Sequence, residues 1–133
     1  MTESVDELTI SANIVVQRIY AAPSLRPGYR VLVDRLWPRG ISKEARSWDR
    51  WEKELAPSTP LRRWYHHVPE RFEAFSEQYQ QELLLPERQT TLNNLAAHAQ
   101  SDGILILLTA TRDLAHSAAL VLACTLAQSG CSE

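Results

Sequence analysis

This chain of 133 residues lacks the features that several classes of protein require. It has only two cysteines, Cys124 and Cys131, and no cluster of cysteine and histidine with the spacing of zinc ligands. We therefore expect neither a structural disulfide nor a metal site. No apolar run approaches the roughly 18–20 residues of a membrane-spanning helix. The sequence also contains no P-loop, no dinucleotide-binding fingerprint and no nucleophile elbow, which excludes the enzymes that depend on those motifs.

The beginning of the chain, residues 1–7, is acidic and polar, which is not typical of a signal peptide. We expect a cytoplasmic protein with no membrane contact. A chain of this length forms one domain and can bury a core without disulfides. We predict a flexible segment over residues 1–12, a single α/β domain over residues 13–128 and a tail over residues 129–133.

Apolar runs rich in branched side chains predict three short strands, over residues 14–20, 29–33 and 104–108. Apolar periodicity, prolines and capping residues predict five helices, over residues 42–55, 61–66, from 69, from 86 and over about 113–128. The last strand passes directly into a helix, which is half of a βαβ unit. We therefore predict a small three-layer α/β domain with a short, mostly parallel sheet flanked by helices. Antiparallel pairing of the first two strands stays open.

Residues 28–40 form the most informative run, because polar residues crowd together where a predicted strand ends. A second polar segment, residues 109–113, lies between the last strand and the last helix, whose free backbone amides favour an anion. Ligands of open α/β sheets bind beyond the carboxyl ends of the strands. If the two strands are parallel neighbours, both segments meet in one crevice.

The two segments supply the candidate site residues. Asp34 and His116 are the candidates for acid or base catalysis, although the Asp34 carboxylate could simply orient an arginine. Thr111 or Asp113 could instead be the N-cap of the last helix. Arginine suits planar contact with phosphate or carboxylate. The residues predicted to bind the ligand are Arg35, Trp37, Arg39, Thr109, Thr111 and Arg112.

Basic residues and tryptophans concentrate in one part of the chain. Residues 26–63 hold ten basic and five acidic residues, although the net charge of the whole chain is −2. All four tryptophans lie within residues 37–64. Interleaved arginine and tryptophan can bind single-stranded nucleic acid, but Trp48 and Trp51 share a helical apolar stripe and are predicted to lie in the core.

Residues 34–40 also match the most recognisable motif of a known family, and the chain resembles the YeaO-like branch of the domain-of-unknown-function 488 family. That resemblance implies an α/β fold and no particular activity. Many members carry Asn or Ser and then His or Gln where this chain has Ser117 and Ala118. If the second of these residues has a polar role in other members, this chain lacks it unless His116 takes its place. Further matches are Trp48, Leu55, Pro57, Ser58, Leu61, Arg62, Phe75, Tyr79 and residues 105–113 and 119–122.

From these patterns we predict a protein that binds an anionic, phosphate-bearing small molecule and needs no cofactor. Whether it is also a metal-independent enzyme stays open. One alternative is a nucleic-acid-binding module that uses the basic, tryptophan-containing segment 26–64. The other is an interaction protein or homodimer whose arginines are purely structural.

Overall fold

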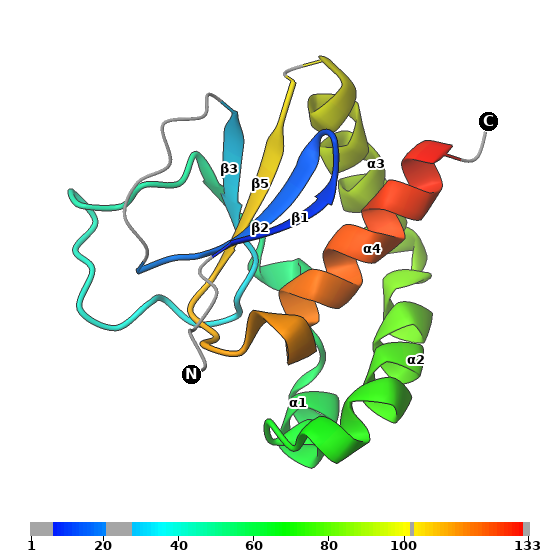
Figure 1. Ribbon diagram of the computed structural model, residues 1–133. Coiled ribbons are helices and arrows are strands. Elements are labelled where there is room, and N and C mark those ends of the chain that lie inside the picture. Colours follow the sequence, from blue (N-terminus) through cyan, green and yellow to red (C-terminus); the bar gives the residue numbers. More distant parts are fainter. Residues whose placement is uncertain (1–6, 21–27, 102, 132–133) are drawn as a thin grey trace, which may run out of the picture.

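The computed structural model describes residues 7–20, 28–101 and 103–131. In this part of the chain, five strands form one sheet in the order β1-β2-β5-β3-β4 (Figure 1). Strands β2, β5, β3 and β4 are parallel, and β1 is antiparallel to β2. The α/β class and the mostly parallel sheet are therefore confirmed. The strands are β1 (Glu7–Ser11), β2 (Ile14–Arg18), β3 (Tyr29–Leu32), β4 (Arg50–Trp51) and β5 (Leu105–Thr109).

Strand β5 occupies the centre of the sheet, and all five of its residues are buried. Its apolar run lacks alternation because both of its faces are covered. Leu107 pairs with Val16 of β2 on one side and with Val31 of β3 on the other. The strand therefore separates β2 from β3, which excludes the antiparallel pairing of those two strands.

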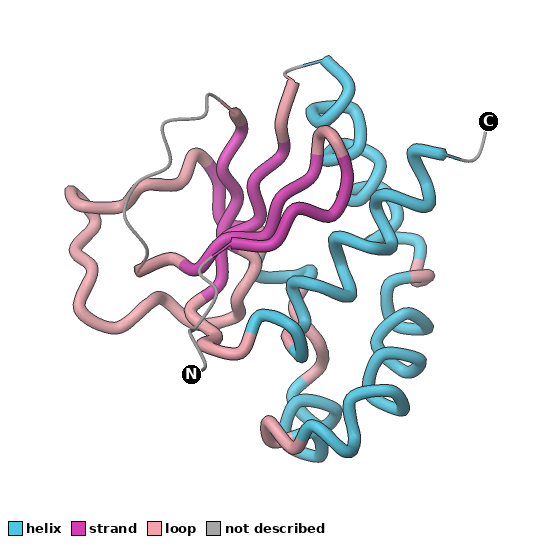
Figure 2. Tube along the Cα trace, in the orientation of Figure 1, coloured by secondary structure: helices cyan, strands magenta, loops and turns pink. Residues whose placement is uncertain are grey.

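The helices pack on one face of the sheet, where they enclose the larger part of the core (Figures 1 and 2). The Ser58 hydroxyl accepts a hydrogen bond from the Leu61 amide at 3.4 Å and so caps the first helix. Prolines stand near the starts of two helices, where their missing N–H costs nothing. The helices are α1 (Thr59–Tyr65), α2 (Phe72–Leu83), α3 (Pro86–Ser101) and α4 (Ala118–Cys131), with 3-10 turns at Lys53–Leu55, Pro69–Arg71 and Leu114–His116.

The opposite face of the sheet is covered by an irregular segment, residues 37–49, which leads into β4 and supplies the third layer (Figure 2). The Trp37 ring meets Trp48 and Trp51 edge-on, at centroid distances of 4.9 and 5.6 Å. The helix predicted over residues 42–55 is wrong. Trp48 and Trp51 have helical spacing, but both rings pack on the sheet. The backbone of residues 49–52 forms its hydrogen bonds with β3 and not within a helix.

Strand β1 lies within residues 1–12, for which we expected a flexible segment. Residues 1–6 lie outside the described residues. Polar and apolar residues alternate along β1, and Leu8 and Ile10 pack against the core on the helical side. The sequence pattern therefore carries a weak strand signal there. None of the helices in the described part of the chain has both the length and the apolar composition needed to cross a bilayer.

Candidate functional site

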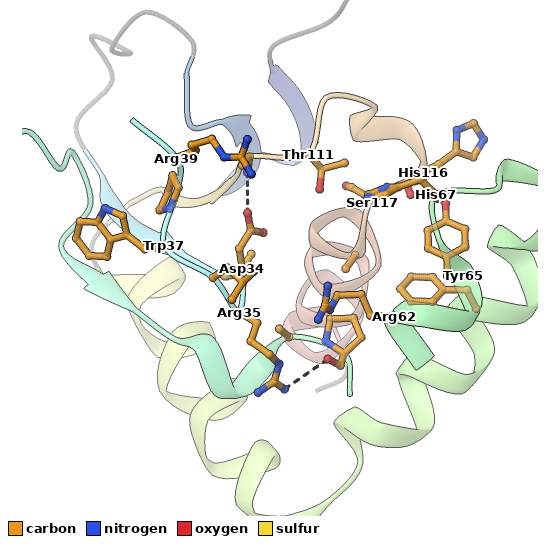
Figure 3. Close-up of a pocket in the computed structure, with 18 of the residues that line it drawn as sticks. Asp34, Arg35, Trp37, Arg39, Arg62, Tyr65, His67, Thr111, His116 and Ser117 are labelled. Carbon is orange, nitrogen blue, oxygen red and sulfur yellow. Dashed lines mark hydrogen bonds between the residues drawn. The ribbon is translucent and has the colours of Figure 1, made fainter. Parts of the chain in front are cut away.

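A pocket of about 300 Å³ opens beyond the carboxyl ends of β3 and β5 (Figure 3). Because the two strands are parallel neighbours, the segments that follow them lie side by side. Most of the lining comes from four parts of the chain: residues 33–39, the stretch before α1, α1 with the turn after it, and the connection from β5 to the start of α4. Tyr20 and Phe75 of α2 complete it. The structure thus brings together Asp34, Arg35, Trp37, Arg39, Thr111 and His116 of the predicted residues.

Asp34 lies where β3 ends, and its carboxylate is fixed by the end of β5. The Thr109 hydroxyl donates to Oδ1 at 2.7 Å, and the Ala110 amide donates to Oδ2 at 2.8 Å. The Thr111 amide in turn donates to the Thr109 hydroxyl at 3.2 Å. Thr109 is only 1% exposed. In this arrangement Thr109 positions Asp34 and does not line the pocket.

Burial raises the pKa of the Asp34 carboxyl above its ordinary value, because desolvation disfavours the charged form. The hydrogen bonds from Ala110 and Thr109 oppose this rise in pKa, and so does the nearby His67. No ion pair joins Asp34 to any residue in the described part of the chain. The pocket therefore contains a carboxylate whose charge no protein cation neutralises directly.

The raised pKa of Asp34 predicts a pH-dependent stability difference between the wild type and Asp34→Asn. The folded protein holds the Asp34 proton more tightly than the unfolded chain does. This contribution is fully present below the unfolded pKa, near 3.8, and is lost as the pH rises through the higher folded pKa. Asparagine keeps the shape, and it can accept from Ala110 and donate to Thr109. We therefore expect Asp34→Asn to gain stability relative to the wild type as the pH rises.

Urea unfolding of both proteins between about pH 4 and pH 8 measures this difference at each pH. A difference in unfolding free energy that stays flat, or that falls as the pH rises, would contradict the assignment. Thr109→Val is the companion variant, because it removes one hydrogen bond that favours the carboxylate. When Asp34→Asn is introduced into Thr109→Val, its gain in unfolding free energy relative to Thr109→Val alone should continue to a higher pH.

Arg39 and Arg62 carry the two guanidinium groups of the pocket that have no partner among the described residues. Arg39 lies in the loop after β3 and Arg62 lies on α1, so they approach the cavity from different elements (Figure 3). Both side chains are exposed. The Tyr20 hydroxyl donates to the Arg39 carbonyl at 2.8 Å, which fixes the backbone of that loop.

The other two predicted arginines lie differently. The Arg35 guanidinium turns toward the stretch before α1 and donates to the Pro57 carbonyl at 3.4 Å (Figure 3, dashed line). Its Nε is buried and has no hydrogen-bond partner. Arg112 is exposed and does not line the pocket. Arg35 thus connects two walls of the pocket, and only Arg39 of the three predicted arginines presents a free guanidinium to it.

Trp37 and His116 line the pocket but are held by neighbouring groups. The Trp37 indole N–H donates to the Ile41 carbonyl. The His116 Nδ1 lies 2.8 Å from a carboxylate oxygen of Asp113, and the Tyr65 hydroxyl donates to the His116 carbonyl at 2.6 Å. No hydrogen bond links Asp34 to His116 in the described residues. Their roles as acid and base stay predictions.

The N-cap of α4 is Ser117, and neither Thr111 nor Asp113 has this role. The Ser117 hydroxyl accepts from the Leu120 amide at 3.1 Å and donates to the Leu114 carbonyl at 2.8 Å. A 3-10 turn precedes α4, so the helix begins at Ala118, five residues later than the sequence suggested. This connection leaves Thr111 at the pocket with its hydroxyl unused by the cap.

Arg62, Tyr65 and His67 also line the pocket and were not among the predicted site residues. They come from α1 and from the turn that ends it. His66 and His67 have φ angles of 47° and 55°, a left-handed conformation that non-glycine residues rarely adopt. This turn places His67 at the cavity (Figure 3). The sequence signal was weak, because a helix that ends in this way usually has glycine at that point.

Comparisons with known proteins place the chain in a family. Residues 13–132 match the model of a family described as the inactive DUF488-N3 subclade, and the chain belongs to that family. The predicted resemblance to the domain-of-unknown-function 488 family and its YeaO-like branch is confirmed.

Two relatives show how far the similarity extends. Uncharacterized protein Rv3073c of Mycobacterium tuberculosis is 44% identical over 108 residues, which cover 81% of this chain and 88% of the relative. Uncharacterized protein YeaO of Escherichia coli is 40% identical over 111 residues, which cover 84% of this chain and 94% of the relative. No solved structure matches the chain significantly.

Proposed function

We propose that the pocket binds a phosphate-bearing small molecule and does not convert it. The observation that carries this proposal is the pair of unpartnered guanidiniums, Arg39 and Arg62, at one cavity. Guanidinium groups bind phosphate oxygens through paired, charge-assisted hydrogen bonds. The lining contains three arginines and one acid, Asp34, so the cavity has an excess of positive charge.

Binding without turnover is supported by the description of the family as inactive. The arrangement of the polar groups agrees with it. His116 is engaged with Asp113, and the Ser117 hydroxyl is used as a helix cap. Asp34 receives two hydrogen bonds that hold it in place. These contacts suit a preformed binding site.

Replacing either free arginine is expected to weaken phosphate binding. Each charge-assisted hydrogen bond is worth about 1.5–3 kcal/mol, so Arg39→Ala and Arg62→Ala should each weaken the binding of pyrophosphate or ribose 5-phosphate about 10- to 100-fold. Isothermal titration calorimetry measures the loss, and thermal shift reports it more quickly through ligand stabilisation.

Arg63→Ala is the matched control. Arg63 is also exposed on α1, but it does not line the pocket. Its replacement by alanine changes the net charge of the protein by the same amount as the two pocket variants do. Equally weakened phosphate binding in all three variants would mean that the net charge of the protein, and not the pocket, causes the effect. An absence of binding to the wild type would contradict the proposal outright.

The nucleic-acid alternative has less support. Trp37 packs against both Trp48 and Trp51, so these three rings are not free to stack on bases. Only Trp64 of the four tryptophans is largely exposed, and Arg71 covers its ring. The alternative of an interaction protein or homodimer with structural arginines stays a prediction. Oligonucleotide binding that weakens steeply with salt would restore the first alternative.

A further inference from the structure

The Asp34 carboxylate has a fixed orientation and an unused edge. Each oxygen already accepts one hydrogen bond, from Thr109 or from Ala110. A carboxylate offers about four acceptor positions, so each oxygen keeps one further lone pair. Asp34 is the only acid among the residues that line the pocket, and its side chain lies at the cavity (Figure 3). A ligand with two adjacent donors would fit this edge.

The pocket that contains this carboxylate also has apolar walls. Val33, Ala56, Tyr65, Phe75 and Ala118 contribute to the lining. Tyr65 and Phe75 stack on each other with ring centroids 4.3 Å apart, so both rings are held in place by packing. Apolar and aromatic side chains in the same cavity as a carboxylate suit a flat heteroaromatic ring better than a bare sugar, which has no apolar face of that size.

The donors and acceptors of the nucleobases then restrict the choice of ring. Guanine presents a ring N–H and an exocyclic amino group side by side on its Watson–Crick edge. Adenine and cytosine place an acceptor beside their amino group, and uracil has one N–H between two carbonyls. Proteins read an unpaired base through hydrogen bonds to this edge combined with apolar and aromatic contacts. A carboxylate with two free lone pairs therefore matches guanine among the common bases.

We propose that the pocket is selective for a guanine nucleotide, whose paired N–H donors bind Asp34 and whose phosphate binds Arg39 and Arg62. This inference rests on the proposed phosphate-binding function and names its ligand class. The ligand carries negative charge where the protein has free cations and donors where the protein has a free carboxylate. Burial raises the pKa of Asp34, and the two donors would stabilise its ionised form.

Calorimetric titration of the full chain with five ligands at one pH and salt concentration tests the selectivity. The ligands are guanosine, inosine, adenosine and 2′-deoxyguanosine 5′-monophosphates and ribose 5-phosphate. We expect the guanine nucleotide to bind at least 10-fold more tightly than the adenine nucleotide, which would set an acceptor against the carboxylate. Inosine monophosphate lacks the amino group and should fall between them. The deoxy nucleotide should bind as well as its ribose form.

Asp34→Asn separates the two proposals. It should abolish the preference for guanine over adenine, whereas ribose 5-phosphate, which has no base, should still bind at least as tightly as it binds the wild type. Glu73→Gln is the matched control, because Glu73 is an exposed acid on α2 that does not line the pocket. If Asp34→Asn does not fold, the comparison of guanine with inosine nucleotides on the wild type still decides the question.

Three outcomes would overturn the inference. Equal affinity for all five ligands would leave a phosphate pocket without base selectivity. A large loss for the deoxy nucleotide would mean that Asp34 binds the ribose hydroxyls. Binding of none of the five ligands would remove the phosphate-binding function together with the guanine selectivity.

Discussion

Leu107→Ala is expected to lower the free energy of unfolding by about 3–5 kcal/mol. Leu107 is fully buried at the centre of β5, the middle strand of the sheet, and it packs in the core on the helical side. Truncation of a buried leucine loses its transfer free energy and leaves a cavity that a sheet paired on both sides cannot close. Urea unfolding followed by far-ultraviolet circular dichroism measures the loss.

A loss of this size is large for a domain whose total stability is about 5–15 kcal/mol. Leu84→Ala provides the control, because the Leu84 side chain is 62% exposed where α2 ends. That variant should stay within about 0.5 kcal/mol of the wild type. Similar losses for the two variants would mean that β5 does not occupy the centre of the sheet.

Tyr79→Phe is expected to lower the free energy of unfolding by about 1–3 kcal/mol, because it removes the donor of a buried hydrogen bond. The Tyr79 hydroxyl donates to the Leu55 carbonyl in the core, and burial holds the pKa of this hydroxyl well above its ordinary value. The variant leaves that carbonyl buried without this donor. Ala56 and Pro57, which follow it, form part of the pocket wall. We therefore expect weaker phosphate binding in addition to lower stability.

Tyr20→Phe is the control, because it also removes a tyrosine hydroxyl, but from an exposed side chain. The Tyr20 hydroxyl also donates to a backbone carbonyl, that of Arg39, but the side chain is 43% exposed. Water can replace this hydrogen bond, so the change in unfolding free energy should stay below about 0.5 kcal/mol. If the two variants lose the same stability, burial of the Tyr79 hydrogen bond is not the cause of its effect.

The elements that the sequence predicted well are those whose pattern reflects local physics. Strand β5 is a continuous apolar run bounded by a turn and a polar segment, and α3 begins at Pro86 as expected. The polar segments after β3 and β5 could be placed together because parallel neighbours share one edge. Asp34 belongs to that prediction, but its partners are Thr109 and Ala110 and not an arginine.

The failures have a common cause, since in each case distant contacts decide the local conformation. The segment over residues 42–55 has helical spacing, yet its tryptophans pack on the sheet and its backbone bonds to β3. Arg62 and His67 reach the pocket only because α1 lies beside the sheet end and because two histidines adopt positive φ. No pattern within α1 contains that information.

The cluster of Trp37, Trp48 and Trp51 has an optical consequence. The Trp37 indole is in edge contact with the other two, whereas Trp64 belongs to α1 on the helical side. Three of the four tryptophans therefore lie on this face of the sheet, and the tryptophan fluorescence of the native protein comes mainly from them. Because Trp37 also lines the pocket, a bound nucleotide would reach this chromophore directly. The protein thus carries its own fluorescent reporter beside the cavity.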